Sequence, residues 1–256
     1  MGLAWLQRWT GLGWHSLLDA VFPPRCLVCE SSLPAGLTTV ALCSDCRDEV
    51  QAERQRPYCP TCANSVAPYE LSGGRCRECR EVSLRVGGIV RVAGYRGPLG
   101  ELMRAYKYHG QEAPGLLLAQ WLAAAVQAAP WSGWVEAVVP VPTHWRHRLR
   151  RPLHAAEELA RHVARSAGLP LVPLLRRRRG GPHQVGLPSA QRQPNVRGAF
   201  ALEPGVQLET ARLLLIDDVR TTGSTLEECA KVLLRAGAAE VYAGVVLRAG
   251  SAEAGA

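Results

Sequence analysis

The sequence predicts an α/β fold: a twisted, mostly parallel sheet with helices on both faces, preceded by a small cysteine-rich module. Three observations lead to this prediction. The apolar run at residues 213–216 is too short for a helix and has the composition of a buried parallel strand. A helical pattern follows, with Leu226, Ala230 and Leu233 on one side and Gly237 as a C-terminal stop. Near the N-terminus, eight cysteines form four Cys-x-x-Cys pairs.

Length and composition allow one large domain with a small module attached. The chain has 256 residues, of which 47% are hydrophobic, and this is enough for a substantial core. The formal net charge of +8 favours polyanionic or phosphorylated partners. No stretch approaches about 18 consecutive apolar residues, so we expect no transmembrane helix.

The N-terminal residues 1–22 are expected to form an amphipathic helix. Trp5, Trp9 and Trp14 stand among leucines, but a basic start, a continuous apolar core and a cleavage site are missing, which argues against a signal peptide. The helix either packs on the body of the protein, which we favour, or lies on a membrane surface. We expect a cytoplasmic protein, free or peripheral at the inner face of the membrane, with a disordered tail at residues 251–256.

The four Cys-x-x-Cys units predict two structural zinc ions in a double zinc ribbon over residues 23–86. A Cys-x-x-Cys turn directs two thiolates at one ion, and two such turns complete a tetrahedral site. A disulfide framework is the alternative, but it requires an oxidising compartment that the missing secretion signal does not support. Spacing alone leaves sequential and interlaced pairing open. Sequential pairing, which we prefer, groups Cys26, Cys29, Cys43 and Cys46 in one site and Cys59, Cys62, Cys76 and Cys79 in the other.

Residues 87–250 are expected to form the larger domain. Its elements follow from hydrophobic periodicity and from glycine and proline stops. In chain order, the prediction is an alternating strand at 89–95, helices at about 99–108 and 114–128, a proline-broken buried strand at 135–142, a helix at about 152–166, the strand at 213–216 and the helix ending at Gly237. The end of the strand at 135–142 should lie at the same edge of the sheet as the end of the strand at 213–216.

An arginine-rich stretch runs from His144 to Gly198, with twelve arginines against two acids. Arginine binds phosphate oxygens in a fork and stacks on bases. Residues 176–195 are too irregular for a helix or strand, and a long loop inside a compact domain is typically a lid or a disordered insert. Three interpretations stay open: a solvated basic loop, a nucleic-acid contact, or a lid over a polyphosphate ligand.

The ten residues 217–226 carry the clearest chemistry in the chain. The acidic pair Asp217 and Asp218 ends a strand, and the next residues open a helix with backbone N–H groups and hydroxyls that suit a terminal phosphate. The Gly-Lys-Ser/Thr ending of an NTPase loop is missing. Two carboxylates beside a phosphate suit sugar hydroxyls or a divalent cation, so the expected ligand is a ribose 5-phosphate. A solvated Asp-Asp turn is the alternative. The expected phosphate-binding residues are Thr221, Thr222, Gly223, Ser224 and Thr225.

Residues 213–225 resemble the phosphoribosyl-pyrophosphate (PRPP) signature of type I phosphoribosyltransferases: an apolar strand, two acids and a Thr-Thr-Gly-Ser-Thr loop. This resemblance implies a type I phosphoribosyltransferase-like sheet. It also implies that Asp217 and Asp218 hold the ribose hydroxyls, that the loop holds the 5-phosphate, and that PRPP binds with Mg²⁺.

Nearly the whole chain is similar to the ComF family of competence-associated phosphoribosyltransferase-like proteins. The matching motifs are Phe22 to Cys26, Lys107 to Gly110, Val139 to Pro142, Gln184 to Leu187 with Arg192, Asn195 to Phe200, and the PRPP loop. The resemblance implies that Lys107 approaches the diphosphate, that Gln184 to Arg197 form a mobile loop, and that Pro140, Val141, Pro142 and Thr143 form the pyrophosphate-binding turn. It further implies a link to DNA uptake in natural transformation or to nucleotide metabolism, with single-stranded DNA and the competence helicase machinery as partners.

Two functions are therefore expected. The first is pentosyl transfer from PRPP to an unidentified acceptor, in which Asp217 and Asp218 act catalytically. The second is a non-catalytic factor that handles single-stranded DNA and keeps the PRPP pocket as a sensor or nucleotide clamp. Where the family usually has Gly-Phe-Asn-Gln, this chain has Arg-Pro-Leu-His at 151–154, and no acceptor-recognising acid stands out. The residues expected in the mobile loop or at nucleic acid are Arg176, Arg177, Arg178, Arg179, Gln184, Arg192 and Arg197.

Overall fold

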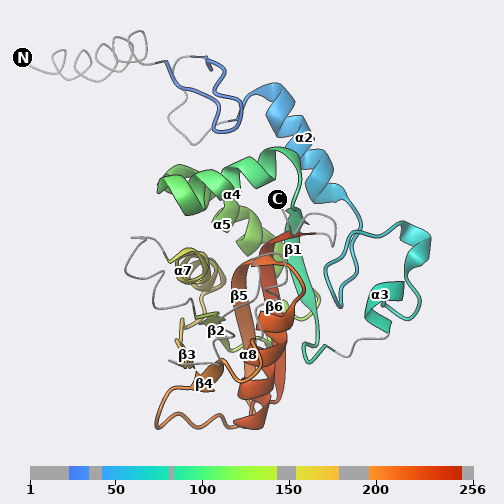
Figure 1. The fold of residues 1–256 in the computed structure, drawn as a ribbon, viewed down its shortest axis with the longest axis vertical. Helices are drawn as coiled ribbons and strands as arrows, with labels where there is room; N and C mark the ends of the chain where they lie inside the picture. Colours follow the sequence, from blue (N-terminus) through green and yellow to red (C-terminus); the bar gives the residue numbers. More distant parts are fainter. Residues whose placement is uncertain (1–22, 35–41, 81–83, 143–153, 179–195, 250–256) are drawn as a thin grey trace, which may run out of the picture.

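The computed structural model describes residues 23–34, 42–80, 84–142, 154–178 and 196–249 (Figure 1). Some sequence-based predictions concern other residues and lie outside the described ones. They are the helix at 1–22, the tail at 251–256, and the roles of Thr143, Arg179, Gln184 and Arg192.

Four parallel strands form the central sheet, which confirms the predicted fold class. Their order across the sheet is β1 (Ile89–Gly94), β6 (Glu240–Arg248), β5 (Arg212–Arg220) and β2 (Ala137–Pro140). β6 was not predicted, although residues 241–247 are buried throughout and lie at the centre of the sheet. The alternation expected for β1 is wrong, because all six of its residues are buried. Neighbouring elements cover both faces of this strand.

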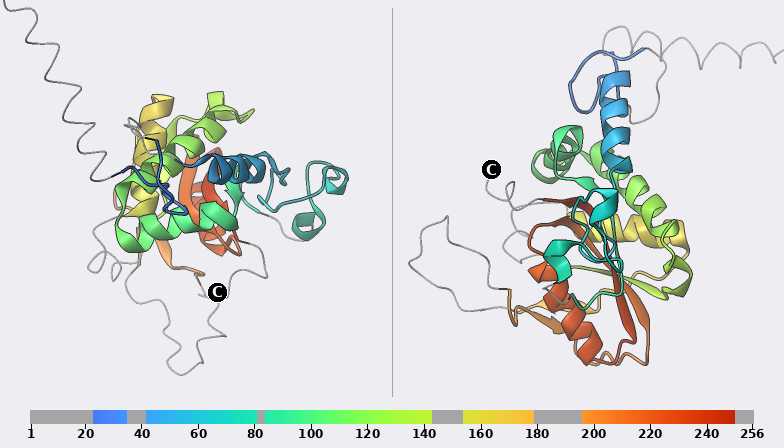
Figure 2. Two further views of the ribbon diagram at one scale, coloured as in Figure 1. Left: turned by 90° about the horizontal axis from the view of Figure 1, so that it is seen from above. Right: turned by 90° about the vertical axis from the view of Figure 1, so that its right-hand side faces the viewer.

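Each helix predicted in the larger domain is present, with ends shifted by a few residues. They are α4 (Gly97–His109), α5 (Glu112–Gln127), α7 (Ala155–Ala167) and α8 (Ser224–Arg235), and a 3-10 turn η3 (Ser132–Trp134) precedes β2. α5 and α7 cover one face of the sheet and α8 covers the other (Figure 2, right). Within the described residues, no helix combines the length and apolar character that a membrane crossing requires.

The side chains of β5 alternate between the two faces of the sheet. Leu214 and Ile216 join the core beneath α5 and α7, whereas Leu213 and Leu215 join the core beneath α8. Because successive strand residues point to opposite faces, this alternation separates the side chains of neighbouring residues at the end of the strand as well.

A two-stranded hairpin corrects the prediction that residues from 176 onward are irregular. β3 (Leu175–Arg177) pairs antiparallel with β4 (Phe200–Leu202), and the Arg178 N–H donates to the Ala199 carbonyl at 2.8 Å. The Arg177 guanidinium lies over the Phe200 ring, 5.4 Å from its centroid. This pairing joins segments more than twenty residues apart, so local periodicity could not reveal it.

The cysteine-rich module contains α2 (Ser44–Gln55), the 3-10 turn η2 (Pro68–Glu70) and α3 (Arg77–Arg80). α2, which was not predicted, packs against α4 and β1. The part of the module that follows α2 lies beside β1 (Figure 1), and the Ile89 N–H donates to the Pro60 carbonyl at 2.8 Å. The module is therefore attached to the free edge of the sheet.

Candidate functional site

The eight paired cysteines form two clusters of four, and the sequential pairing is confirmed. Within each cluster the four Sγ atoms lie within 4.8 Å of one another. Sγ–Sγ distances are 3.6 Å for Cys29 and Cys43, and 3.5 Å for Cys59 and Cys79. A tetrahedral site with Zn–S bonds of about 2.3 Å requires roughly 3.8 Å between sulfurs, so the donor sets fit zinc. All nine cysteines, which lie in the described part of the chain, are free of disulfides.

The two clusters differ in their surroundings. In cluster 1 (Cys26, Cys29, Cys43 and Cys46), Cys29 is exposed and Cys43 is half-buried. In cluster 2 (Cys59, Cys62, Cys76 and Cys79), every side chain is at most 3% exposed. Cluster 1 is part of the core formed with α4 and α5, whereas cluster 2 forms a small core of its own.

The ends of β2 and β5 lie side by side at the carboxyl edge of the sheet, as predicted. Pro140 is in register with Ile216, and the Val141 N–H donates to the Ile216 carbonyl at 2.9 Å. Pro142 and Asp217 therefore follow at the same edge. In open parallel sheets this edge is where ligands bind.

The two aspartates occupy the last part of β5 and have different surroundings. Asp218 is 17% exposed, and its Oδ2 lies 2.7 Å from the Nζ of Lys107 in the last turn of α4. Asp217 is partly buried, and its Oδ1 accepts a hydrogen bond from the Asp218 N–H at 2.9 Å. Lys107 and Asp218, two of the predicted PRPP-binding residues, thus come together from elements that are distant in the sequence.

Burial and the neighbouring Asp218 carboxylate raise the pKa of Asp217 to about 7. The Asp218 N–H and the Lys107 ammonium act in the opposite direction and do not cancel this effect. At neutral pH the pair therefore carries less negative charge than two free carboxylates, and Asp217 can donate a hydrogen bond in part of the molecules.

Replacing Asp217 with asparagine should remove a pH dependence of stability. The folded-state pKa lies above the ordinary value of 3.8. The stabilisation from protonating Asp217 is therefore complete below about pH 4 and is lost as the pH rises through about 7. Thermal melts should show a flatter profile for D217N between about pH 5 and 8, with on the order of 2 kcal/mol more stability than the wild type at about pH 8. The exposed-site variant Asp48→Asn is the control. A parallel fall in stability for wild type and D217N would contradict the expectation.

Residues 221–225 form the turn between β5 and α8, here called the phosphate loop. α8 begins at Ser224, and its N-cap residue Gly223, with φ 86°, has no side chain that could cap the helix. The Ser224 N–H donates to the Thr222 Oγ1 at 3.4 Å. The Thr222 Oγ1 and Ser224 Oγ hydroxyls lie 2.9 Å apart. A helix N-terminus whose N-cap residue supplies no side-chain acceptor is a favourable anion site, because its remaining N–H groups and the helix dipole both attract negative charge.

Two buried arginines beside this edge were missed by the sequence analysis. Arg220 and Arg91 are 5% and 3% exposed. The signal that could have found them is an arginine inside an otherwise apolar strand, since such a cation needs specific partners when it is buried. Both donate hydrogen bonds to backbone carbonyls of the cysteine-rich module.

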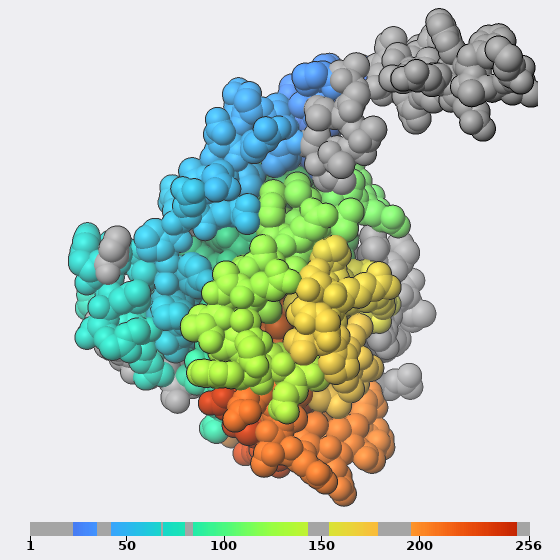
Figure 3. Space-filling model, turned by 180° about the vertical axis from the view of Figure 1, so that it is seen from behind, coloured from blue at the N-terminus to red at the C-terminus, as the bar shows by residue number. Residues whose placement is uncertain are grey.

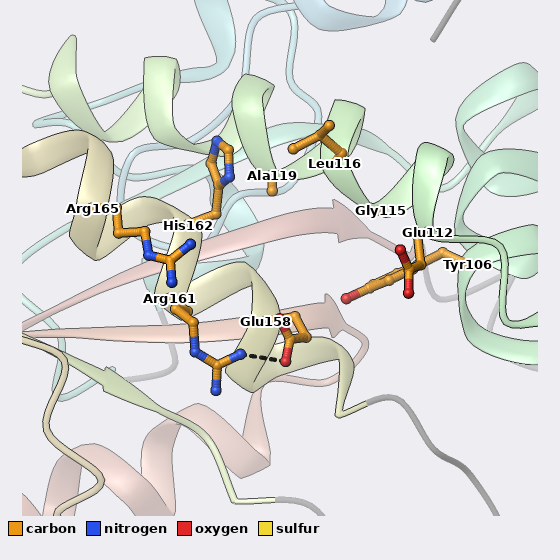
Figure 4. Close-up of a pocket in the computed structure, with 9 residues that line it drawn as sticks. All are labelled: Tyr106, Glu112, Gly115, Leu116, Ala119, Glu158, Arg161, His162 and Arg165. Atoms are coloured by element: carbon orange, nitrogen blue, oxygen red, sulfur yellow. Dashed lines mark hydrogen bonds and ion pairs between the residues drawn. The ribbon is translucent and has the colours of Figure 1, made fainter.

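A separate cavity of about 350 Å³ lies between α5 and α7. Figure 3 shows these two helices side by side on the outer face, and in Figure 4 Tyr106 of α4 points into the cavity toward Glu158. Burial, Glu158 and Asp218 raise the pKa of Tyr106 above its ordinary range. Asp218 is therefore close enough to Tyr106 to act on its charge, but neither the aspartates nor the phosphate-loop residues line the cavity.

The arginine-rich segment reaches the site only in part. Arg176 and Arg178 are exposed on the β3–β4 hairpin, and Arg197 is exposed just before β4. The Gly198 N–H donates to the Glu228 carboxylate at 2.9 Å, which ties the end of the predicted mobile loop to α8. The structure thus brings the Arg197 end of this loop to the helix that the phosphate loop opens.

Comparison with known proteins matches both parts of the chain. Residues 17–80 match the double zinc ribbon domain, and residues 152–254 match the phosphoribosyl transferase domain. Competence protein F of Haemophilus influenzae is 29% identical over 222 residues, covering 85% of this chain and 93% of that protein. DNA utilization protein YhgH of Salmonella typhimurium is 32% identical over 224 residues, covering 86% and 94%.

Among solved structures, the allosteric regulatory enzyme of purine biosynthesis is 20% identical, with a TM-score of 0.39 over 56% of this chain and 30% of that chain. Adenine phosphoribosyltransferase of Leishmania donovani is 12% identical, with a TM-score of 0.37 over 66% and 85%.

The parallel sheet, the two cysteine clusters and the two matched domains define a phosphoribosyltransferase-like protein with an N-terminal double zinc ribbon. The identity to YhgH extends over most of both chains. This chain belongs to the ComF/YhgH family of competence and DNA utilization proteins.

Proposed function

We propose that the protein binds PRPP together with Mg²⁺ at the carboxyl edge of the sheet and transfers its phosphoribosyl group. The main support is that Asp218 pairs with Lys107 at 2.7 Å, and that both aspartates directly precede the loop that opens α8, whose N-cap Gly223 has no capping side chain. In this proposal two acids for a sugar, donors for a phosphate and a cation for a diphosphate act at one edge of the sheet.

Each group has one task in this proposal. Asp217 and Asp218 accept hydrogen bonds from the ribose hydroxyls, and residues 221–225 hold the 5-phosphate. Pro140 to Thr143 provide the turn for the pyrophosphate, and Lys107 stabilises the charge that develops on it as it leaves C1 of the ribose. When bound, Mg²⁺ neutralises part of the diphosphate charge. The partly protonated Asp217 lowers the repulsion between this anionic ligand and the acidic pair.

The test is binding of PRPP with Mg²⁺ to the full-length protein, followed by thermal unfolding and by calorimetry. Ribose 5-phosphate and pyrophosphate serve as partial ligands, because each addresses only one end of the site. We expect PRPP to raise the melting temperature more than either part alone. No shift with any of the three would contradict the proposal. Release of pyrophosphate in the presence of candidate bases then reports turnover.

A second candidate function is the handling of single-stranded DNA, with the PRPP pocket as a sensor or nucleotide clamp. The names of the relatives, competence protein F and DNA utilization protein, support it. So do the exposed side chains of Arg176 and Arg178 on the hairpin, which is linked to α8 through β4. Arginines on one surface can bind successive phosphates of a strand.

Replacing Arg176 and Arg178 with alanine should weaken the salt dependence of oligonucleotide binding. Each phosphate contact to a single strand adds about 0.7 to the log–log salt slope, so losing two should reduce it by about 1.4. Fluorescence anisotropy over a range of salt concentrations measures the slope. Arg177→Ala is the matched control, because its guanidinium already packs on Phe200 and should affect stability instead. Oligonucleotide binding that does not depend on salt concentration, or a salt slope that is the same in the variant and the wild type, would argue against this surface as the DNA-binding site.

A further inference from the structure

Arg220 connects the phosphate loop to cluster 2. Its Nη1 donates to the carbonyl oxygen of Cys62, a residue of that cluster. The same guanidinium lies against Gly223: a Cβ built on that glycine would come within 2.5 to 2.8 Å of three guanidinium atoms. One side chain therefore touches the backbone of a predicted zinc ligand and the backbone of the loop that faces the phosphate.

Arg220 is itself held firmly. Its carbonyl oxygen accepts a hydrogen bond from the Ala249 N–H at 2.9 Å, so its backbone is fixed to the end of β6. Its side chain is buried between Gly223 and the Cys62 carbonyl, and in a close-packed interior a shift of one neighbour displaces the next. A movement of the segment around Cys62 is consequently transmitted to the loop.

Arg91 fixes the same segment from a second direction. Its Nη1 donates to the Ala63 carbonyl at 2.6 Å and its Nη2 to Ser65 Oγ at 2.8 Å. The Arg91 guanidinium also lies over the Tyr58 ring, 5.1 Å from the centroid. Residues on either side of Cys62 are thus attached to the sheet, and the cluster is oriented relative to β5.

Charge explains why these cations tolerate burial. Neither guanidinium contacts a carboxylate in the described part of the chain, although a buried cation is costly without a negative partner. A zinc ion with four thiolates has a formal charge of about −2, and cluster 2 would place that charge beside both arginines. The donor set and the two cations therefore complement each other electrostatically.

We propose that cluster 2 holds the phosphate loop in its binding shape through Arg220, so that zinc retention in this cluster and ligand binding at the loop are coupled. Arg220 acts as a positioning residue and does not touch the ligand. Cluster 1 has no comparable link in the described residues, because it packs into the core with α4 and α5. This inference rests on the proposed function for the identity of the ligand.

The test compares full-length wild type with Arg220→Met, and uses Arg212→Met as the matched control. Arg212 lies at the other end of β5, with its side chain 48% exposed and 3.7 Å from Glu240. We expect R220M to weaken PRPP–Mg²⁺ binding in calorimetry by about 10- to 100-fold, the range typical for groups that orient metal ligands. R212M should bind as the wild type does.

Zinc release gives a readout that does not depend on activity. A colorimetric chelator such as 4-(2-pyridylazo)resorcinol reports the rate, and alkylation with peptide mapping identifies the cluster that opened. We expect R220M to speed release from cluster 2, and saturating PRPP to slow it in the wild type but not in R220M, because coupling between two sites is reciprocal. If R220M does not fold, the variant Arg220→Lys, which keeps the positive charge, is used in its place.

The outcomes separate the two proposals. If the wild type binds PRPP and R220M binds it equally well with unchanged zinc release, the coupling is wrong and the PRPP site stands. If no variant binds PRPP, the proposed function is wrong, and hydrogen exchange of residues 221–226 decides the coupling. Faster exchange in R220M than in R212M would support it, and equal exchange would overturn it.

Discussion

Replacing Cys62 with alanine should reduce the zinc content from two ions to one per chain and unfold residues 57–80. This segment contains one four-residue helix and one short 3-10 turn, and its small core consists of the four cysteines with a few flanking apolar residues. So small a core cannot offset the loss of chain entropy without metal. The apparent binding free energy of a structural zinc ion is about 10–16 kcal/mol in small zinc modules, which exceeds what the segment gains from packing.

Elemental analysis gives the metal content, and limited proteolysis reports whether residues 57–80 have opened. Cys229→Ala is the matched control, since Cys229 is buried in α8, outside both clusters, and should keep two ions. Two ions in C62A would show that the cluster does not bind zinc as assigned. Fewer than two in the wild type would contradict the double ribbon.

Replacing Asp217 and Asp218 together with alanine should abolish the stabilisation by PRPP with Mg²⁺. At about 100 times the dissociation constant, a ligand adds about 2.7 kcal/mol, which corresponds to roughly 5–10 °C in melting temperature for a domain of this size. The double variant loses both groups that would hold the ribose. Its melting temperature without ligand should fall mainly through the lost ion pair between Asp218 and Lys107, because burial already opposes ionisation of Asp217.

Glu157→Ala with Glu158→Ala is the matched control for this experiment. It also removes two adjacent carboxylates, from the first turn of α7, where both pair with Arg161. One of them lines the cavity between α5 and α7, so the control also tests that cavity as the ligand site. If PRPP with Mg²⁺ still raised the melting temperature of the aspartate variant, or no longer raised that of the glutamate variant, the ligand site would not lie at the end of β5.

Local patterns were sufficient for features that are encoded locally. The strand at 213–216 and the helix after it were predicted because apolar residues follow the period of each element. The cysteine pairing could be preferred because each Cys-x-x-Cys turn forms half a site, although only the folded chain shows which halves meet. The prediction that β2 and β5 end at the same edge of the sheet followed from the rule that parallel strands have their carboxyl ends on one side.

What could not be predicted depends on contacts between distant segments. The β3–β4 hairpin joins Leu175 to Leu202 across residues that have no regular pattern. β6 was overlooked because Ala243 and Gly244, residue types that are depleted in strands, interrupt its run of large apolar residues. Arg220 stands inside the phosphate signature, but its role depends on Cys62, which is 158 positions earlier in the chain. Patterns among residues that are close in the sequence cannot reveal so distant a partner.

The unequal exposure of the two cysteine clusters predicts the order in which the module would fail under chemical stress. Oxidants and chelators attack accessible thiolates first, so damage should begin at Cys29 rather than at the enclosed sulfurs of Cys59 or Cys62. Metal loss should then be biphasic, with a fast ion and a slow ion. A molecule that has lost only the fast ion would be disordered around cluster 1, whereas cluster 2 and the phosphate loop would keep their structure.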